Sequence, residues 1–349
     1  MRTFRGLALC FVFVGRALAQ EAVPASTPEA VPTTSPSSHQ VQDALLVVTA
    51  REGSGSGFVA RLNGTPFLFT NAHVIAGASL LQFQLLSGAP VPPGKGRLAF
   101  GHDVAVFNAP ETPLTLEISA DVSKDAAIGD EVIVYGNSQG ASVVTELKGK
   151  IVGLGPELVE VDAPFVPGNS GSPIVHIKSG KVIGIASYVQ TRKHDEISKD
   201  SGVAEVRRFG YRLDTIKNWQ DLNWPLFQRE AAQIQAIEDF SEAYFQFWED
   251  LNEHEGRISS LGSANSRIQR HLRNLQRESI NTRGDKEFQK AVTSFLWALQ
   301  SEAKQEFLPG RPAPKYWYTN HEWNRQKELR EAISKDLGSE VSERNTRTN

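Results

Sequence analysis

Cysteine is almost absent from this sequence, since Cys10 is the only one among 349 residues. Cys10 lies in a segment that we expect to be removed, so the mature protein would have neither a disulfide nor a thiolate site. An excess of positive charge is also missing, because 37 Lys and Arg stand against 40 Asp and Glu and give a formal net charge of -3. This balance excludes a global basic field that would hold nucleic acid or an anionic membrane surface.

The apolar run of residues 6–15 is too short to span a bilayer, which takes about 20 residues. It follows two arginines and precedes Ala17-Leu18-Ala19, an order that is typical of a secretory signal peptide. We therefore predict that residues 1–19 are a signal peptide and that the protein is exported, to the periplasm or out of the cell. A buried first strand or helix is the alternative. Residues 20–41 are rich in Pro, Ser and Thr without an apolar period and predict a disordered linker.

The rest of the chain has the composition of a folded protein, with 40% hydrophobic and 22% charged residues, and its length suggests about two domains. Between residues 42 and 222, short β-rich runs alternate with turn residues, which predicts an all-β sandwich or barrel. Residues 223–338 change to helical spacing and predict an α-helical domain. Its apolar stripes need burial in helix hairpins, a coiled coil or self-association. Residues 339–349 are expected to be a frayed, disordered tail.

Three short stretches of the β-rich block carry the residue types of serine acyl transfer. TNAHVI places His73 after an apolar strand, GHDVAV places Asp103 at a turn before a strand, and VPGNSGSP places Ser170 in a Gly-rich loop. A serine hydroxyl is a weak nucleophile until a base such as histidine takes its proton. A buried carboxylate fixes the tautomer of that histidine. The order His, Asp, Ser on an all-β chain is one known solution to this chemistry, so we predict these three as the catalytic residues.

The loop around Ser170 also has the composition of an oxyanion hole. Its glycines let the chain turn sharply and aim backbone N–H groups inward. We assign the hole to Gly168, Asn169 and Ser170, with the N–H groups of Gly168 and Ser170 as the donors. A donor of this kind lowers the reaction barrier by about 3 kcal/mol.

TNAHVI, HDVAVF and PGNSGSP resemble the three signature stretches of chymotrypsin-fold serine endopeptidases, and most closely those of the bacterial Deg/HtrA-type branch. GSGSGF and GIASYV resemble strands of the same branch that precede the histidine and line the substrate cleft. The resemblance covers residues 42–215 and implies an all-β, two-barrel, chymotrypsin-like (trypsin-like) protease domain, here followed by the α-helical domain. It implies that Ser170 is the nucleophile, that His73 is the general base and that Asp103 orients His73.

The sequence departs from the family pattern at several positions. Ser172 stands where the family usually has a second glycine. Asn169 replaces the aspartate that pairs with a freed N-terminus in digestive members, so we expect no activation of that kind. No PDZ-like segment is visible after residue 222.

The resemblance places the substrate pocket at Pro164, Ser187, Tyr188 and Val189. Pro164 carries no charge where trypsin-like members have a charged pocket floor, and Val189 narrows the mouth where many members have glycine. We therefore predict small aliphatic side chains before the scissile bond and no preference for Arg or Lys.

Some neighbouring residues are alternatives for these roles. Asp121, Asp125 and Asp130 are rivals of Asp103 as the orienting carboxylate, but none opens an apolar strand so directly. His102 is expected to be a solvated turn residue.

Together these patterns predict an exported serine endopeptidase that cleaves unfolded or envelope proteins through a Ser170 acyl-enzyme. No metal or organic cofactor is implied, and the expected partner is a protein or peptide substrate rather than nucleic acid. No membrane span is expected after signal cleavage, and the C-terminal helices would form a homo-oligomer or bind a partner protein. The alternative is a protease-like module that binds extended peptide without cleaving it.

Overall fold

The computed structural model describes residues 41–50, 53–78, 80–110, 115–138, 143–192, 205–253, 286–306 and 312–348. The predicted signal peptide, and the predicted linker as far as residue 40, lie outside the described residues.

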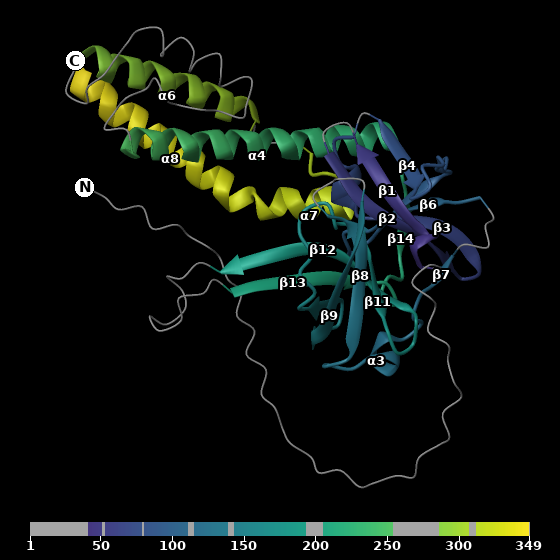
Figure 1. The fold of residues 1–349 in the computed structure, drawn as a ribbon. Coiled ribbons are helices and arrows are strands. Elements are labelled where there is room, and N and C mark those ends of the chain that lie inside the picture. Colours follow the sequence, from purple (N-terminus) through teal and green to yellow (C-terminus); the bar gives the residue numbers. More distant parts are fainter. Residues whose placement is uncertain are drawn as a thin grey trace, which may run out of the picture. The chain divides into compact units, whose positions relative to one another are not determined.

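The first half of the β domain is a single sheet. Its strands are β1 (Leu45–Ala50), β2 (Gly53–Leu62), β3 (Thr65–Thr70), β4 (Leu81–Leu85), β5 (Gly96–Ala99), β6 (Ala105–Asn108), β7 (Leu116–Glu117) and β14 (Trp219–Asp221). They follow the order β14-β5-β6-β3-β2-β1-β4, and β7 pairs with β2. Figure 1 shows β1, β2, β3, β4 and β6 together in this half of the domain. β14, the last strand of the domain, therefore pairs with β5 in the sheet formed by the first strands of the chain.

The second half is a barrel of six strands. They are β8 (Glu131–Asn137), β9 (Val144–Leu154), β10 (Leu158–Val161), β11 (Pro173–His176), β12 (Val182–Arg192) and β13 (Glu205–Arg212). The ladder closes in the order β10-β13-β12-β11-β8-β9, so every strand of this barrel has two neighbours. In the first half the ladder stays open, with β14 and β4 as its edges. The predicted fold class, an all-β chymotrypsin-like domain followed by helices, is confirmed, but of the two predicted barrels only the second closes among the described strands.

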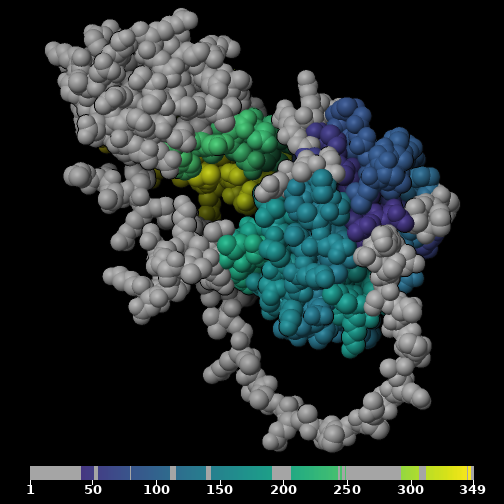
Figure 2. All heavy atoms as spheres, in the orientation of Figure 1, coloured from purple at the N-terminus to yellow at the C-terminus, as the bar shows by residue number. Residues whose placement is uncertain are grey.

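One apolar core joins the two halves. Phe58 and Phe69 of the first sheet stack with their ring centroids 5.2 Å apart, and Tyr135 and Ile185 of the barrel belong to the same buried cluster. Burying a side chain of this size stabilises the fold by about 1.5–3 kcal/mol. Figure 2 shows the purple and blue atoms of the first half packed against the teal atoms of the second. The short segments between the strands therefore meet along a fixed boundary.

Helices occur both inside and after the β domain. The short α2 (Ala72–Ile75) and α3 (Val122–Asp125) lie between strands, whereas α4 (Trp224–Glu253), α6 (Lys286–Glu306), α7 (Trp317–Arg325) and α8 (Lys327–Thr348) follow β14. Side chains of α4, α6 and α8 share a separate apolar core that includes Phe240, Phe295 and Leu337. Among the helices that the structure describes, none has the length and apolarity needed to cross a bilayer.

The C-terminal segment differs from the expected frayed tail, because α8 continues to Thr348. Ile333, Leu337 and Val341 recur every four residues and are buried in the helical core. The apolar stripe therefore continues one turn beyond Gly338. Burial of this stripe outweighs the cost of about 1 kcal/mol for a glycine inside a helix.

The beginning of α4 is attached to the first sheet. Phe227 is fully buried there and meets the ring of Tyr316 edge to face, with centroids 5.6 Å apart. Gln228 donates a hydrogen bond from Nε2 to the carbonyl of Ile75 at 2.9 Å. Since Ile75 is the last residue of α2, the helices that follow the β domain are fixed against the turn that carries His73.

Candidate active site

Asp103 holds His73 by two hydrogen bonds. The backbone N–H of His73 donates to Oδ1 of Asp103 at 2.9 Å, and Nδ1 of the imidazole lies 2.6 Å from Oδ2. Asp103 is buried, and its backbone carbonyl accepts a hydrogen bond from the Asn71 side chain at 2.7 Å. An ionised carboxylate only accepts hydrogen bonds, so Nδ1 carries the proton and Nε2 is left as the basic nitrogen.

The same carboxylate sets the pKa of His73. Burial lowers the pKa of the imidazole, but the charge and hydrogen bond of Asp103, with a smaller contribution from Glu322, outweigh burial, so the net pKa is raised. The side chain is still 35% exposed and can therefore meet a molecule from outside. A histidine of this kind is neutral, and able to act as a base, only above its raised pKa.

Ser187 connects this pair to Ser170. Its hydroxyl donates to Oδ2 of Asp103 at 2.7 Å, and its carbonyl accepts the Ser170 hydroxyl at 3.4 Å. Ser187 falls at an irregularity in the pairing of β12 with β13, between Ala186 and Tyr188. A bulge of this type re-aims a side chain. We predicted Ser187 as a pocket residue, and its bridging position has no signal in the sequence because the bulge is a property of strand pairing.

Glycines and Ser56 shape the loop that carries Ser170. Gly168 and Gly171 have φ values of 95° and 89°, which favour glycine. A Cβ on Gly171 would overlap the carbonyl of Ser56. Ser56 in turn donates its N–H to the Ser170 carbonyl and its hydroxyl to the Gly168 carbonyl, each at 2.8 Å. Both carbonyls are therefore held by β2.

The N–H groups of Gly168 and Ser170 remain available. Within the part of the chain that the structure describes, neither donates to a protein atom. Asn169, which we had included in the oxyanion hole, differs: its N–H donates to the Val166 carbonyl at 3.0 Å, and its Oδ1 accepts the Val166 N–H at 2.9 Å. Asn169 therefore closes the turn of the loop and supplies no donor for a ligand.

Ser172 lies just behind the loop, in a tight site. It is fully buried, and its hydroxyl is without a hydrogen-bond partner among the described residues. A Cβ on Gly136 of β8 would overlap this hydroxyl and lie 2.7 Å from Nδ2 of Asn169. Ser172 therefore fits only because position 136 has no side chain.

The other predicted pocket residues lie on β12 and on the loop between β10 and β11. Tyr188 stacks on Phe209, with ring centroids 5.1 Å apart, so its ring forms a fixed apolar surface. Val189 is 40% exposed, and Pro164 is exposed on the loop before Ser170. Ser187 differs from these three because its side chain is buried against Asp103. The preference for small aliphatic side chains stays a prediction.

The rival carboxylates are engaged elsewhere. Asp121 pairs with Lys124 at 2.8 Å, Asp125 pairs with Lys181 at 2.9 Å, and Asp130 lies 3.2 Å from Nε2 of His176.

His102 is not the solvated residue that we expected. It is 4% exposed, and its ring nitrogens lie 3.2 Å from the Phe100 carbonyl and 2.9 Å from the Thr215 hydroxyl. Its imidazole therefore ties the turn before Asp103 to the chain after β13.

Across the described ranges, no group of three or more His, Cys, Asp and Glu side chains is placed to hold a metal ion.

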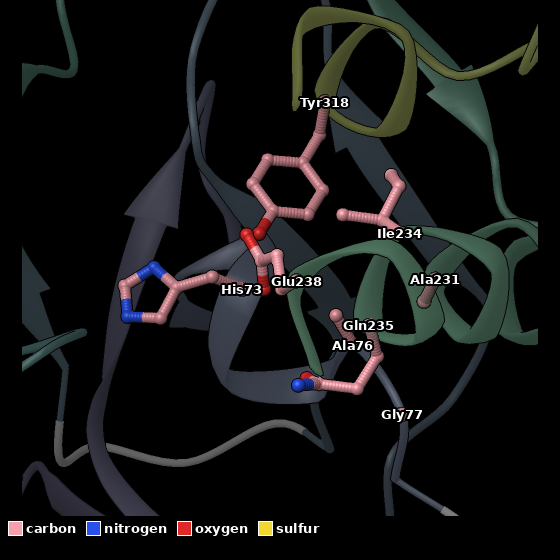
Figure 3. Close-up of a pocket in the computed structure, with 8 residues that line it drawn as sticks. All are labelled: His73, Ala76, Gly77, Ala231, Ile234, Gln235, Glu238 and Tyr318. Carbon is pink, nitrogen blue, oxygen red and sulfur yellow. The ribbon is translucent and has the colours of Figure 1, made fainter. Parts of the chain in front are cut away.

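Sequence reasoning missed the part that the C-terminal helices play. Glu238 of α4 and Tyr318 of α7 line one pocket together with His73 of α2 (Figure 3). Burial and the charges of Asp103 and two glutamates raise the pKa of Tyr318, so its phenol stays protonated. No local pattern indicates that these residues approach a histidine far away in the sequence.

Comparison with known proteins identifies the class of protein to which this fold and this site are similar. Residues 55–185 match the sequence profile of the trypsin-like peptidase domain family. The β domain is therefore similar to trypsin-like peptidase domains, and the predicted resemblance to Deg/HtrA-type proteases is confirmed.

Three relatives show the extent of the similarity. The chain is 31% identical over 204 residues to chloroplastic Protease Do-like 1 of Arabidopsis thaliana, covering 55% of this chain and 44% of the relative. It is 31% identical over 153 residues to Serine protease Do-like HtrA of Bacillus subtilis, covering 39% and 33%. It is 29% identical over 146 residues to the "Probable periplasmic serine endoprotease DegP-like" of Pseudomonas fluorescens, covering 40% and 30%. The chain thus spans less than half the length of each.

Among solved structures, the serine endoprotease from Yersinia pestis is similar at 23% identity, with a TM-score of 0.38, covering 52% of this chain and 64% of that one.

Proposed function

We propose that this chain is a serine endopeptidase that hydrolyses peptide bonds through an acyl-enzyme on Ser170, with His73 as general base and Asp103 as its orienting carboxylate. The observation that carries the proposal is the hydrogen bond of 2.6 Å between His73 and Asp103. Ser187 connects this pair to a serine loop in which two N–H groups donate to no atom of the described residues. A nucleophile, an oriented base and donors for an oxyanion are the three parts that acyl transfer needs.

In the proposed reaction, the Ser170 hydroxyl turns from the Ser187 carbonyl towards Nε2 of His73. Its oxygen attacks the substrate carbonyl carbon while Nε2 takes the proton. The substrate carbonyl oxygen becomes negative and accepts hydrogen bonds from the N–H groups of Gly168 and Ser170. The imidazolium is stabilised by Asp103 and gives its proton to the leaving amine as the C–N bond breaks. Water then repeats the sequence on the ester, releasing the acid and restoring the hydroxyl.

The test compares the wild-type chain with Ser170→Ala in two assays. A fluorophosphonate probe forms a bond to an activated serine oxygen, so we expect labelling of the wild type and none of the variant. Casein should be degraded by the wild type only. Equal casein turnover in the two proteins would refute the mechanism. A folded wild type that resists the probe would instead favour the non-catalytic module that binds extended peptide.

We also propose that the protein is exported and acts in the periplasm or outside the cell on unfolded or envelope proteins. The order of charges, apolar residues and small residues in residues 1–19 supports export, and the Pseudomonas fluorescens relative carries the name "Probable periplasmic serine endoprotease DegP-like". N-terminal sequencing of the mature protein should begin at Gln20. A mature protein that keeps residues 1–19 would contradict export by this signal.

The C-terminal helices are proposed to bind a second copy of the chain or a partner protein. Phe245 and Trp297 support this role, since 46% and 49% of their surfaces are exposed, whereas Phe240, Tyr244 and Phe295 of the same helices are buried. Light scattering of the purified protein should then give a mass above that of one chain. A monomer would argue against self-association.

A further inference from the structure

A small pocket lies where the C-terminal helices approach His73. Its volume is about 180 Å³, and its walls come from α2 with the turn that follows, from α4 and from α7 (Figure 3). Clefts that hold whole drug-sized ligands measure about 300–1,000 Å³. This pocket therefore has room for about one side chain.

The walls of the pocket differ from one another in chemistry. Ala231 and Ile234 of α4 and the ring of Tyr318 supply apolar surface, and Gln235 and Glu238 supply polar groups. Lysine and arginine combine an apolar stem with a charged end, and they bury the stem while the end keeps polar partners. An aromatic face such as that of Tyr318 also attracts a cation.

The acidic side of the pocket is incompletely neutralised. Arg325 lies 2.7 Å from Glu322 and 3.5 Å from Glu238, so two carboxylates share one guanidinium. Burial, followed by the like charge of Glu322, raises the pKa of Glu238. A cation that enters the pocket relieves both effects, because it compensates for lost hydration and for repulsion between the carboxylates.

The position of the pocket relates it to the scissile bond. A base that transfers a proton from the nucleophile to the leaving amine must lie beside that bond. In an extended peptide, successive side chains point to opposite sides. If the residue before the bond points to the surface formed by Tyr188 and Val189, its two neighbours point away from that surface, and the pocket beside His73 is the site that we assign to one of them.

We propose that this pocket is a substrate subsite for a lysine or arginine side chain on a residue adjacent to the one that precedes the scissile bond, with Glu238 as the specificity-determining residue. The inference rests on the proposed protease function, since it concerns the substrate of the same site. The subsite is contributed by helices that follow the β domain, so the helical part of the chain takes part in recognising substrate.

The first experiment digests a peptide library made from denatured proteins and reads the cleavage sites by mass spectrometry. We expect Lys and Arg to be enriched two residues before the bond or immediately after it. Matched peptides that carry Lys, Met or Glu at the enriched position then give kcat/KM. Glu238 is 38% exposed, so solvent screens its charge. We therefore expect about a fivefold preference for Lys over Met, which corresponds to about 1 kcal/mol.

Variants of α4 assign the preference to one carboxylate. Glu238→Gln should bring the Lys-to-Met ratio close to one, and Glu238→Lys should reverse the order so that the Glu peptide becomes the better substrate. Glu242→Gln is the matched control, because Glu242 is exposed on the same helix and outside the pocket lining. It should keep the wild-type ratio.

The outcomes separate this inference from the function on which it rests. Cleavage without enrichment at either position, or a ratio that Glu238→Gln and Glu242→Gln lower equally, would overturn the subsite and leave the protease function standing. Failure of the wild type to cleave both the library and casein would overturn the function and the subsite together. Reversal by Glu238→Lys would support the subsite even where Glu238→Gln disturbs the packing of α4.

Discussion

Replacing Asp103 with asparagine tests the proposed role of this carboxylate most directly. Its two oxygens accept three hydrogen bonds, from the His73 backbone, the His73 ring and the Ser187 hydroxyl. An amide has one accepting oxygen and one donating nitrogen. If the nitrogen faces the ring, Nδ1 must become the acceptor and Nε2 carries the proton. If the nitrogen faces the backbone, it opposes the His73 N–H.

The first orientation gives the larger effect on rate, because a protonated Nε2 cannot accept the Ser170 proton. The wrong tautomer in a serine triad lowers kcat by about 10⁴, and we expect a loss of this size for Asp103→Asn. The variant also loses the charge that raises the pKa of His73 against the effect of burial. The acid limb of kcat/KM, which lies above the ordinary histidine value of about 6.5 in the wild type, should therefore move to lower pH.

The assay is steady-state hydrolysis of a casein-derived peptide between pH 5 and 9, with thermal unfolding as a check that each variant is folded. Asp121→Asn is the matched control, since Asp121 is a partly exposed carboxylate that pairs with Lys124. It should keep wild-type activity. The reasoning is refuted if a folded Asp103→Asn protein retains activity within tenfold of the wild type, or if its acid limb does not move.

Four further substitutions test the hydrogen bonds and packing around the serine loop. Ser187→Ala removes the donor to Asp103, and we expect kcat to fall by about tenfold in the same assay, since one such bond contributes about 1.5 kcal/mol; an unchanged kcat would contradict the bridging position. Ser172→Ala removes a buried hydroxyl that has no hydrogen-bond partner among the described residues, and it should raise the free energy of unfolding in urea by about 1 kcal/mol; a decrease would mean that the hydroxyl is hydrogen-bonded. Gly136→Ala should lower the free energy of unfolding by about 1–3 kcal/mol, because its methyl group overlaps Ser172, and Ser172→Gly should restore part of the loss; a neutral Gly136→Ala would show that the loop yields.

The segments of the candidate site could be predicted from sequence because each is a local pattern. An apolar strand followed by His73, a turn that contains Asp103 and a Gly-rich loop around Ser170 are all readable within eight residues. The structure places His73 against Asp103, and Ser187 connects them to Ser170. The catalytic roles themselves stay predictions until the experiments above are done.

Ser187 and Asn169 show where local patterns stop being informative. Ser187 faces Asp103 because β12 and β13 shift register at that point, and a register shift is decided by two strands together. The N–H of Asn169 donates to the Val166 carbonyl because the backbone of the loop turns back at this point. Both depend on backbone geometry that residue types alone do not specify.

The helical region shows the same limit at longer range. Gly338 is typical of a helix end, but Leu337 and Val341 gain more from burial than the glycine costs, so α8 continues. Glu238 and Tyr318 reach His73 only because Phe227 and Gln228 attach α4 to the first sheet. Such contacts between distant segments are decided by tertiary packing.

Helix α4 belongs to two apolar cores at once, with Phe227 in the sheet core and Phe240 and Tyr244 in the helical core. Because helix formation is cooperative, the order of α4 in one core depends on its packing in the other. A chain truncated after Leu222 would lack Phe227 and would expose apolar surface of the first sheet beside α2. Trimming the chain to its β domain would therefore loosen His73, the residue that such a fragment would be made to study.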